Sequence, residues 1–284
     1  MCFKGLVSLL RISRWYKNLV IFIPLVFTNN LFNLNSLLIT FLGFFSLCLM
    51  SSANYTINDL FDFNSDKLNP LKKNKPLVKG LISVKSAVFF SIVLIVSSLL
   101  IAYYLSFGFF LFPVALFFST LAYTVLLKKV PLIDLLVIAL NFYLRTTSGT
   151  YLLNVVISPW LILMIFLVAL FLGLGKRYGE LLILGPKASK LRSVFNFYSA
   201  DLLKSMINIV SSMLLLGYCF YTFLAQTNPL IMLSIPVFFF AVFRYLYFIY
   251  SGNKASVESQ LVFKDKQFII ALLCWILIVV LVLY

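Results

Sequence analysis

The apolar residues of this chain gather into nine long runs separated by short polar stretches. The runs cover residues 17–33, 36–57, 84–105, 107–127, 131–153, 157–175, 201–225, 228–250 and 266–284. Each approaches the roughly 20 residues that an α-helix needs to cross a bilayer. An open sheet cannot satisfy its backbone polar groups in lipid, so every run is predicted to be helical. The first run is the weakest, because Pro24 interrupts it and Asn29 and Asn30 end it.

The polar stretches alternate between basic and uncharged along the whole chain. The basic stretches are 4–17, 67–85, 128–129, 176–192 and 254–266, and the uncharged ones are 30–35, 106–108, 154–158 and 226–229. By the positive-inside rule, the N-terminus and the basic connections are cytoplasmic and the C-terminus is outside. The pattern therefore predicts an all-α, multi-pass bundle of nine transmembrane helices in the cell membrane. It forms a single domain over residues 1–284, with its active site on the cytoplasmic side.

Composition supports this prediction and excludes several kinds of chemistry. Hydrophobic residues make up 63% and charged residues 11%, whereas a soluble domain carries about a quarter charged residues. The net charge of +15 is explained by short basic loops, so no nucleic-acid partner is expected. Histidine is absent and the four cysteines lack a paired spacing, which disfavours a histidine base, a zinc site and a disulfide.

The most informative polar stretch ends the second apolar run, and it holds three of the eight acidic residues. On a helix, Asn58, Asp62 and Asp66 repeat at i, i+4 and i+8, and Asp59 joins the latter two at i+3 and i+7. Carboxylates at a bilayer edge are costly unless something binds them. Oxygen ligands on one face suit Mg²⁺, which binds one or two carboxylates together with substrate phosphates. Six lysines follow between residues 67 and 85, so the stretch predicts a magnesium site beside amines for a phosphorylated substrate.

A second polar cluster follows the sixth run at residues 175–180 and continues to Arg192 and Tyr198. One interpretation is a second anion-binding patch, in which Arg177 grips a phosphate bidentately and Lys176 acts as a point charge. The alternative is a solvated loop that only obeys the positive-inside rule.

The fifth run carries a polar stripe formed by Asp134, Asn141, Arg145 and Gly149, spaced at 7, 4 and 4. Counted from Pro131, Arg145 lies about 21 Å along the helix. An arginine at that depth faces the protein interior and is a candidate for function. A structural ion pair inside the bundle is the alternative, and the sequence does not identify a partner.

Together these residues resemble the UbiA superfamily of intramembrane prenyltransferases, nine-helix bundles with a first motif Asn-Asp-x-x-Asp-x-x-x-Asp. Residues 58–66 fit that motif. Most members carry a second aspartate-rich motif after the sixth helix, but between residues 176 and 204 the only acids here are Glu180 and Asp201.

In lacking this second motif, the chain resembles one branch of the superfamily, the decaprenyl-phosphate phosphoribosyltransferases. The matching segments are Trp15 to Asn18, Asp66 to Leu77, Tyr123 to Lys128, Arg145 with Gly149, and Gly175 to Glu180. Three positions differ from the pattern of the branch. Asn69 replaces a histidine, and Lys73 and Lys75 replace arginines, although lysine lacks the planar bidentate fork.

The resemblance implies transfer of 5-phosphoribose from phosphoribosyl pyrophosphate to a polyprenyl phosphate. It implies Mg²⁺ held by Asn58, Asp59, Asp62 and Asp66, with Asp62, Asp66, Lys73 and Arg177 as catalytic residues. The implied substrate-binding residues are Lys17, Asn18, Lys72, Lys75, Tyr123, Lys128, Asp134, Arg145, Lys176, Glu180, Arg192 and Tyr198.

Two other functions stay open, and so does assembly into a homo-oligomer. A prenyltransferase with an aromatic or polyol acceptor would use the same fold, but it would normally show the second aspartate motif. A transporter of a phosphorylated metabolite would show repeat-related broken helices, and no internal repeat is visible in the sequence.

Overall fold

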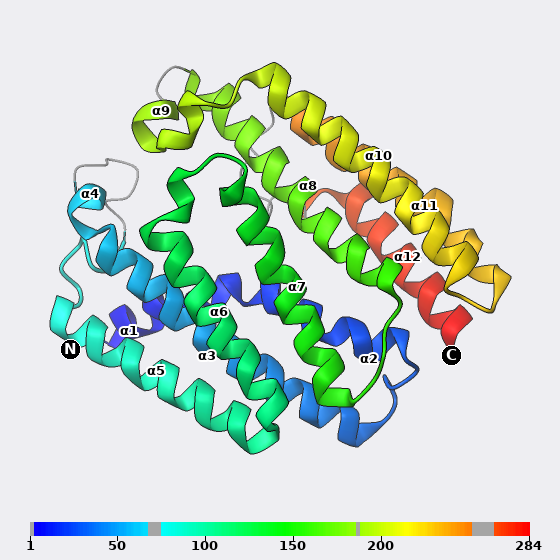
Figure 1. Ribbon diagram of the computed structural model, residues 1–284, viewed down its shortest axis with the longest axis horizontal. Coiled ribbons are helices and arrows are strands. Elements are labelled where there is room, and N and C mark those ends of the chain that lie inside the picture. Colours follow the sequence, from blue (N-terminus) through cyan, green and yellow to red (C-terminus); the bar gives the residue numbers. More distant parts are fainter. Residues whose placement is uncertain (1–2, 68–74, 186–187, 252–263) are drawn as a thin grey trace. The chain divides into compact units, whose positions relative to one another are not determined.

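The computed structural model describes residues 3–67, 75–185, 188–251 and 264–284, and every regular element within these ranges is a helix. The all-α prediction is therefore confirmed. The chain forms two compact units (Figure 1). The first contains residues 1–127 and 144–156, and the second contains 128–143 and 157–284. A single domain over 1–284 stays a prediction.

The first unit is built around two long helices, α3 and α5. Its elements are α1 (Phe3–Leu10), η1 (Ile12–Phe22), α2 (Ile23–Phe27), α3 (Leu34–Phe61), α4 (Phe63–Lys67), α5 (Val84–Leu105), α6 (Phe107–Val125) and the end of α7 (Ile133–Leu153). Helices α3 and α5 lie side by side (Figure 1). The Ser46 hydroxyl donates to the Ser98 carbonyl at 2.9 Å, and the Ser98 hydroxyl returns a bond to the Ser46 carbonyl at 2.8 Å. Small hydroxyl residues at such a contact let two helices approach closely in an apolar medium.

The segment predicted as the first membrane span, 17–33, is not one helix, so this prediction is wrong. The 3₁₀-helix η1 ends at Phe22, and α2 has only five residues, with Pro24 in its first turn. The missing proline N–H costs no hydrogen bond in the first turn, whereas it removes one in a helix interior. A Cβ at Gly149 of α7 would lie 2.3 Å from the Ile21 carbonyl oxygen, so only glycine allows η1 to approach α7 this closely.

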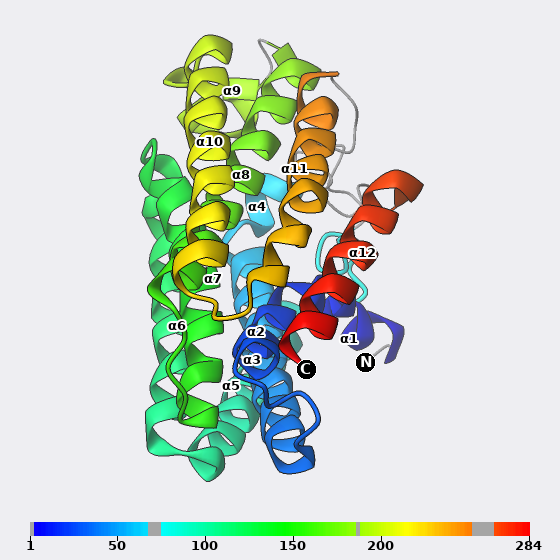
Figure 2. The ribbon, with the colours of Figure 1, turned by 90° about the vertical axis from the view of Figure 1, so that its right-hand side faces the viewer.

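The second unit is a group of long helices with short connections. Its elements are the start of α7, η3 (Leu127–Lys129), α8 (Pro159–Leu184), α9 (Ala188–Leu191), η5 (Ser193–Asn196), α10 (Ala200–Leu224), η6 (Pro229–Ser234), α11 (Ile235–Tyr250) and α12 (Lys266–Leu283). Figure 2 shows α8, α10 and α11 running side by side. Trp275 of α12 donates to the Tyr218 hydroxyl at 2.7 Å, and that hydroxyl pairs with Ser234 at 2.6 Å. These bonds connect α12, α10 and η6.

Seven helical segments in the described ranges are long and apolar enough to cross a membrane. They are Leu34–Phe61, Val84–Leu105, Phe107–Val125, Pro159–Leu184, Ala200–Leu224, Pro229–Tyr250 and Lys266–Leu283. All seven match predicted runs. Helix α7 is a 21-residue helix, as predicted, but its stripe of polar residues keeps it out of this set. The predicted count of nine is not confirmed.

Candidate active site

The acidic stretch 58–66 lies where α3 ends. Helix α3 stops at Phe61, Asp62 forms its C-cap, and α4 begins at Phe63. The Asp62 N–H donates to the Asn58 carbonyl at 3.0 Å, and the Asp66 N–H donates to the Asp62 carbonyl at 2.8 Å. The helical spacing thus continues across the interruption, although the single uninterrupted helix expected through Asp66 is not found.

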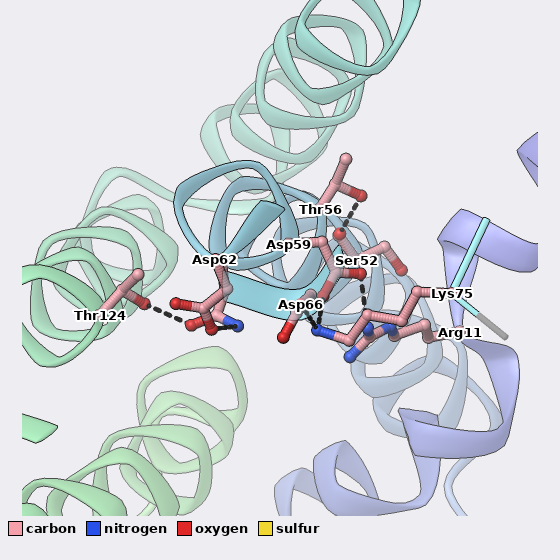
Figure 3. Close-up of polar contacts among 9 residues, drawn as sticks. Arg11, Ser52, Thr56, Asp59, Asp62, Asp66, Lys75 and Thr124 are labelled. Atoms are coloured by element: carbon pink, nitrogen blue, oxygen red, sulfur yellow. Dashed lines mark hydrogen bonds and ion pairs between the residues drawn. The ribbon is translucent and has the colours of Figure 1, made fainter. Parts of the chain in front are cut away.

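The four predicted metal ligands form two groups instead of one. Figure 3 labels the three aspartates among them. In the first group, the Asn58 side-chain amide donates to Asp62 Oδ2 at 3.1 Å. Thr124 of α6 donates its hydroxyl proton to Asn58 Oδ1 at 3.2 Å. The sequence analysis included Thr124 in the matching segment Tyr123 to Lys128 but assigned no role to it, because a threonine near the end of an apolar helix has no distinctive signal.

The second group joins Asp59 and Asp66 through two cations. The Lys75 ammonium donates to Asp59 Oδ1 at 2.7 Å and also to Asp66 Oδ2. The Arg11 guanidinium donates to Asp59 Oδ2. Figure 3 shows both carboxylates joined to the Lys75 ammonium. The sequence analysis placed Lys75 near the motif but assigned no role to Arg11.

Burial makes these ion pairs necessary. Asp59 is 2% exposed and Asp66 is fully buried, and an unpaired buried carboxylate would be strongly destabilising. Burial by itself lowers the pKa of the Lys75 ammonium, but its hydrogen bonds to Asp59 and Asp66 outweigh that effect, so its pKa is raised. Lys75 therefore stays charged at neutral pH.

The N-terminal arm is fixed to α3 beside Asp59. Arg11 adopts the left-handed conformation, with φ of 47°, which costs a non-glycine residue about 1–2 kcal/mol. Next to it, the Trp15 indole N–H donates to the Ser52 hydroxyl at 3.0 Å, and that hydroxyl donates to the Leu10 carbonyl at 2.6 Å. These contacts hold the strained turn in place, so the Arg11 side chain is directed at Asp59.

Arg145 is buried in the first unit, and one of its partners is an amide. Its Nε donates to Asn18 Oδ1 at 2.7 Å, and that oxygen also accepts from the Ser51 hydroxyl at 3.2 Å. The Asn18 amide nitrogen is 3.2 Å from the Cys48 sulfur. Asn18 is fully buried and Arg145 is 8% exposed. These contacts connect η1, α3 and α7, which supports a structural role for both predicted substrate-binding residues.

The remaining predicted residues of this part of the chain are more dispersed. Lys17 is hydrogen-bonded to the Tyr55 hydroxyl of α3. Tyr123 is half-buried next to Thr124 on α6. Lys72 and Lys73 fall outside the described residues, and so does Asn69.

The cluster around Arg177 lies on a helix, so its interpretation as a loop is wrong. Helix α8 extends to Leu184, past the predicted end at 175. Helical geometry places Arg177 and Glu180 on one face, and Arg177 NH1 donates to Glu180 Oε2 at 3.2 Å. Arg177 also reaches Asp134 at the start of α7, because its Nε and NH2 both lie 2.9 Å from Asp134 Oδ2.

Both carboxylate oxygens of Asp134 accept hydrogen bonds. The Tyr198 hydroxyl donates to Asp134 Oδ1 at 2.7 Å and accepts from the Leu132 N–H at 2.7 Å. Leu132 has a φ of 67°, so this bond supports a strained turn. Burial, together with the bond to the neighbouring carboxylate, raises the pKa of Tyr198, and the phenol stays protonated as the donor.

Two cations at this end of α8 keep solvent access. Lys176 Nζ lies 4.0 Å from Glu180 Oε1 and Arg192 Nε lies 3.8 Å from Glu180 Oε2. Their side chains are 43% and 38% exposed, whereas that of Arg177 is 3% exposed. Lys128 lies in η3 of the same unit. An incoming anion would therefore meet Lys176 and Arg192 before Arg177.

A model of the UbiA prenyltransferase family matches residues 19–272. The chain belongs to the UbiA prenyltransferase family. The resemblance stated from the sequence is thus confirmed, and the family together with the apolar helices identifies a multi-pass membrane protein.

Two of its relatives match this UbiA-family chain over nearly its whole length. It is 26% identical to a decaprenyl-phosphate phosphoribosyltransferase of Corynebacterium glutamicum, over 99% of this chain and 87% of the relative. It is also 26% identical to the protein of that name from Mycolicibacterium smegmatis, over 96% of this chain and 90% of the relative. A digeranylgeranylglyceryl phosphate synthase of Pyrococcus horikoshii is 37% identical, but only over 31% of each chain.

Solved structures share the fold of this UbiA-family chain. A UbiA homolog from Archaeoglobus fulgidus bound to DMAPP and Mg²⁺ aligns with a TM-score of 0.74 and 22% identity, over 98% of this chain and 99% of that one. A UbiA homolog from Archaeoglobus fulgidus bound to GPP and Mg²⁺ aligns with a TM-score of 0.73 and 20% identity, with the same coverage.

The chemistry of the acidic stretch fits the magnesium ion that the family implies. No three His, Cys, Asp or Glu side chains of the described residues are grouped closely enough to hold a metal by themselves. Asn58, Asp62 and Asp66 nevertheless offer only oxygen to a hard cation, and the Lys75 ammonium already lies between Asp59 and Asp66. Such a donor set suits Mg²⁺, which keeps several waters and takes further oxygens from substrate phosphates.

Proposed function

We propose that this UbiA-family enzyme transfers 5-phosphoribose from phosphoribosyl pyrophosphate to a polyprenyl phosphate and releases pyrophosphate. The observation that carries this proposal is the basic character of the C-terminal end of α8 and of the residues that follow it. Where a second metal-binding aspartate motif would normally stand, this chain has Lys176, Arg177 and Arg192 around the single acid Glu180. The full-length similarity to two relatives named for this activity supports it.

The difference between the two donors explains why cations matter there. A prenyl diphosphate needs a metal-bound diphosphate and a site for its apolar tail. A phosphoribosyl donor carries an additional 5-phosphate, and that dianion needs positive groups of its own. Exposed Lys176 and Arg192 are suitable candidates. Arg177 would then act as a fixed positive charge behind them, positioned by Asp134.

The reaction needs no histidine. A phosphate oxygen of the acceptor attacks C1 of the ribose and forms a C–O bond, while the bond from C1 to the pyrophosphate oxygen breaks, with inversion at C1. The nucleophile is already anionic at neutral pH, so no general base is required. Catalysis then consists of positioning the two substrates and neutralising the charge on the leaving group.

The acidic stretch 58–66 is the proposed binding site for Mg²⁺ and pyrophosphate. Asn58, Asp62 and Asp66 are the proposed ligands of Mg²⁺, with Asp59 next to them, and Lys75 would contact phosphate oxygens. When bound, Mg²⁺ stabilises the negative charge that develops on the leaving pyrophosphate. Lys73, the other catalytic candidate in this stretch, stays a prediction.

The proposed arrangement in the membrane is nine crossings, with the N-terminus and the active site on the cytoplasmic side. It rests on the alternation of basic and uncharged connections. A single cysteine placed at exposed Lys79, in a cysteine-free background, should resist labelling from outside intact cells. Labelling there would refute the orientation.

Prenyl transfer is the second candidate, because solved neighbours of this fold are bound to GPP or DMAPP with Mg²⁺. Purified protein should be incubated with labelled phosphoribosyl pyrophosphate and a polyprenyl phosphate, with and without Mg²⁺. We expect label in the lipid fraction and free pyrophosphate, both dependent on the metal. Consumption of a prenyl diphosphate with an aromatic acceptor, without label entering lipid, would instead establish the prenyltransferase.

A further inference from the structure

Lys75 contacts two of the carboxylates proposed for the metal site. Its ammonium donates to Asp59 Oδ1 at 2.7 Å and to Asp66 Oδ2. Arg11 adds a second positive charge on Asp59. Asp59 and Asp66 are thus countered by two cations, so the formal charge of this group is zero.

This charge balance affects a bare cation and a metal–diphosphate complex in opposite ways. A nearby like charge disfavours the charged form of a group, and the same repulsion acts on a divalent ion beside an ammonium. The phosphate oxygens of a diphosphate are attracted by the same ammonium and form charge-assisted hydrogen bonds with it.

We propose that Lys75 makes this site select the metal–diphosphate complex over the free metal ion. The inference rests on the proposed function in assigning the carboxylates to Mg²⁺. It does not depend on whether the diphosphate carries ribose or a prenyl chain. Lys75 opposes Mg²⁺ alone, and it contributes a phosphate contact when Mg²⁺ arrives with a diphosphate.

Lys75 and Arg11 differ in their freedom to leave a carboxylate and contact a phosphate. Lysine is a compact point charge on a flexible stem, so Lys75 can turn from a carboxylate to a phosphate. Arg11 is held by the strained backbone at φ 47° and lies over the Tyr55 ring, 5.3 Å from its centroid. Arg11 therefore stays on Asp59 and keeps that buried carboxylate paired while Lys75 moves.

The test compares Lys75→Met with Lys79→Met, which removes an exposed lysine four residues away in the same segment. Binding of Mn²⁺ alone to the purified full chain is followed by the electron paramagnetic resonance of the free ion. Binding of pyrophosphate in excess Mg²⁺ is followed by calorimetry. We expect Lys75→Met to bind Mn²⁺ about tenfold more tightly and Mg²⁺–pyrophosphate about tenfold more weakly. Lys79→Met should change neither.

Several results would overturn the inference. One is unchanged or weaker Mn²⁺ binding by Lys75→Met, and another is tighter Mn²⁺ binding with unchanged pyrophosphate binding. Failure of the unsubstituted protein to bind Mg²⁺–pyrophosphate is a third.

Arg11→Gln serves as a second variant in case Lys75→Met does not fold. It should tighten Mn²⁺ binding about threefold, since its charge is farther from Asp66. It should also weaken Mg²⁺–pyrophosphate binding, because Asp59 would be left unpaired when Lys75 turns to the phosphate. Unaltered Mn²⁺ affinity in this variant would also contradict the inference. If label from phosphoribosyl pyrophosphate never enters lipid while these binding shifts are seen, the proposed donor is wrong and the role of Lys75 stands.

Discussion

Two clusters of buried carboxylates, one in each unit, are paired with different cations. In the first unit, Lys75 and Arg11 reach Asp59 and Asp66 from outside α3, and their side chains are 19% and 26% exposed. In the second unit, Arg177 and Tyr198 enclose Asp134, and the side chains of Arg177 and Asp134 are 3% and 0% exposed. The first cluster is accessible to an exchanging ligand, whereas the second is closed.

The difference in exposure separates a cluster that can bind a ligand from one that supports the fold. A lysine on a flexible stem can turn away from its carboxylates and be replaced by another cation, and the Lys75 side chain is 19% exposed. A buried arginine that is hydrogen-bonded on several nitrogens cannot leave without exposing an unpaired charge. We therefore interpret the Asp134 cluster as a structural support for the basic residues Lys176 and Arg192. We interpret the Asp66 cluster as the place where chemistry occurs.

The largest expected effect comes from opening the closed cluster. Asp134→Ala should destabilise the protein by about 3–5 kcal/mol, because it leaves the Arg177 guanidinium buried without its main partner. Thermal unfolding in detergent would measure this, with Asp201→Ala at the exposed first turn of α10 as the control. Equal melting temperatures for the two variants would show that the cluster is not structural.

The next effect concerns the accessible cluster and should appear in turnover instead of folding. Asp62→Ala and Asp66→Ala should each lower turnover at least about 100-fold, since each removes a proposed Mg²⁺ ligand, while the protein still purifies as a folded species. Activity assays with and without a chelator would test this. Full activity of either variant, or full activity in chelator, would remove magnesium from the proposed reaction.

A smaller effect should follow from removing a single hydroxyl at the closed cluster. Tyr198→Phe leaves Asp134 Oδ1 and the Leu132 N–H without their shared partner, which should cost about 1–3 kcal/mol of stability. Tyr178→Phe, which changes a half-buried tyrosine on α8, is the matched control in thermal unfolding. If Tyr198→Phe also abolished turnover without a loss of stability, the phenol would belong to the chemistry.

The sequence predicted the helices well where hydrophobicity alone decides them. Seven apolar runs became seven helical segments, because crossing a bilayer requires little more than length and apolar composition. The prediction failed at the first run, where Pro24 divides the segment. It also failed at residue 175, because α8 continues through polar residues whose partner, Asp134, lies more than 40 positions earlier in the chain.

The same distinction holds for the candidate site. Asp62 and Asp66 could be found because acidic residues are rare in this chain and were spaced at helical intervals. Arg11 and Thr124 could not, since they reach Asp59 and Asn58 from elements 48 and 66 residues away. Asn18, the amide partner of Arg145, lies 127 residues from it. The periodicity of a sequence predicts which residues share one face of a helix. It does not predict contacts between helices, because these depend on packing.

The length of α8 has a consequence for how a lipid substrate would be used. Its 26 residues extend about 39 Å, whereas the hydrocarbon layer is about 30 Å thick. Helix α8 is therefore long enough for its last turns, with Lys176 and Glu180, to reach the level of the lipid headgroups. A polyprenyl phosphate could present its phosphate there while its tail stays in the bilayer, and the product could leave by lateral diffusion. We expect the rate to follow the mole fraction of acceptor in mixed micelles at constant bulk concentration. A rate that depends only on bulk concentration would show that the lipid is taken up from water.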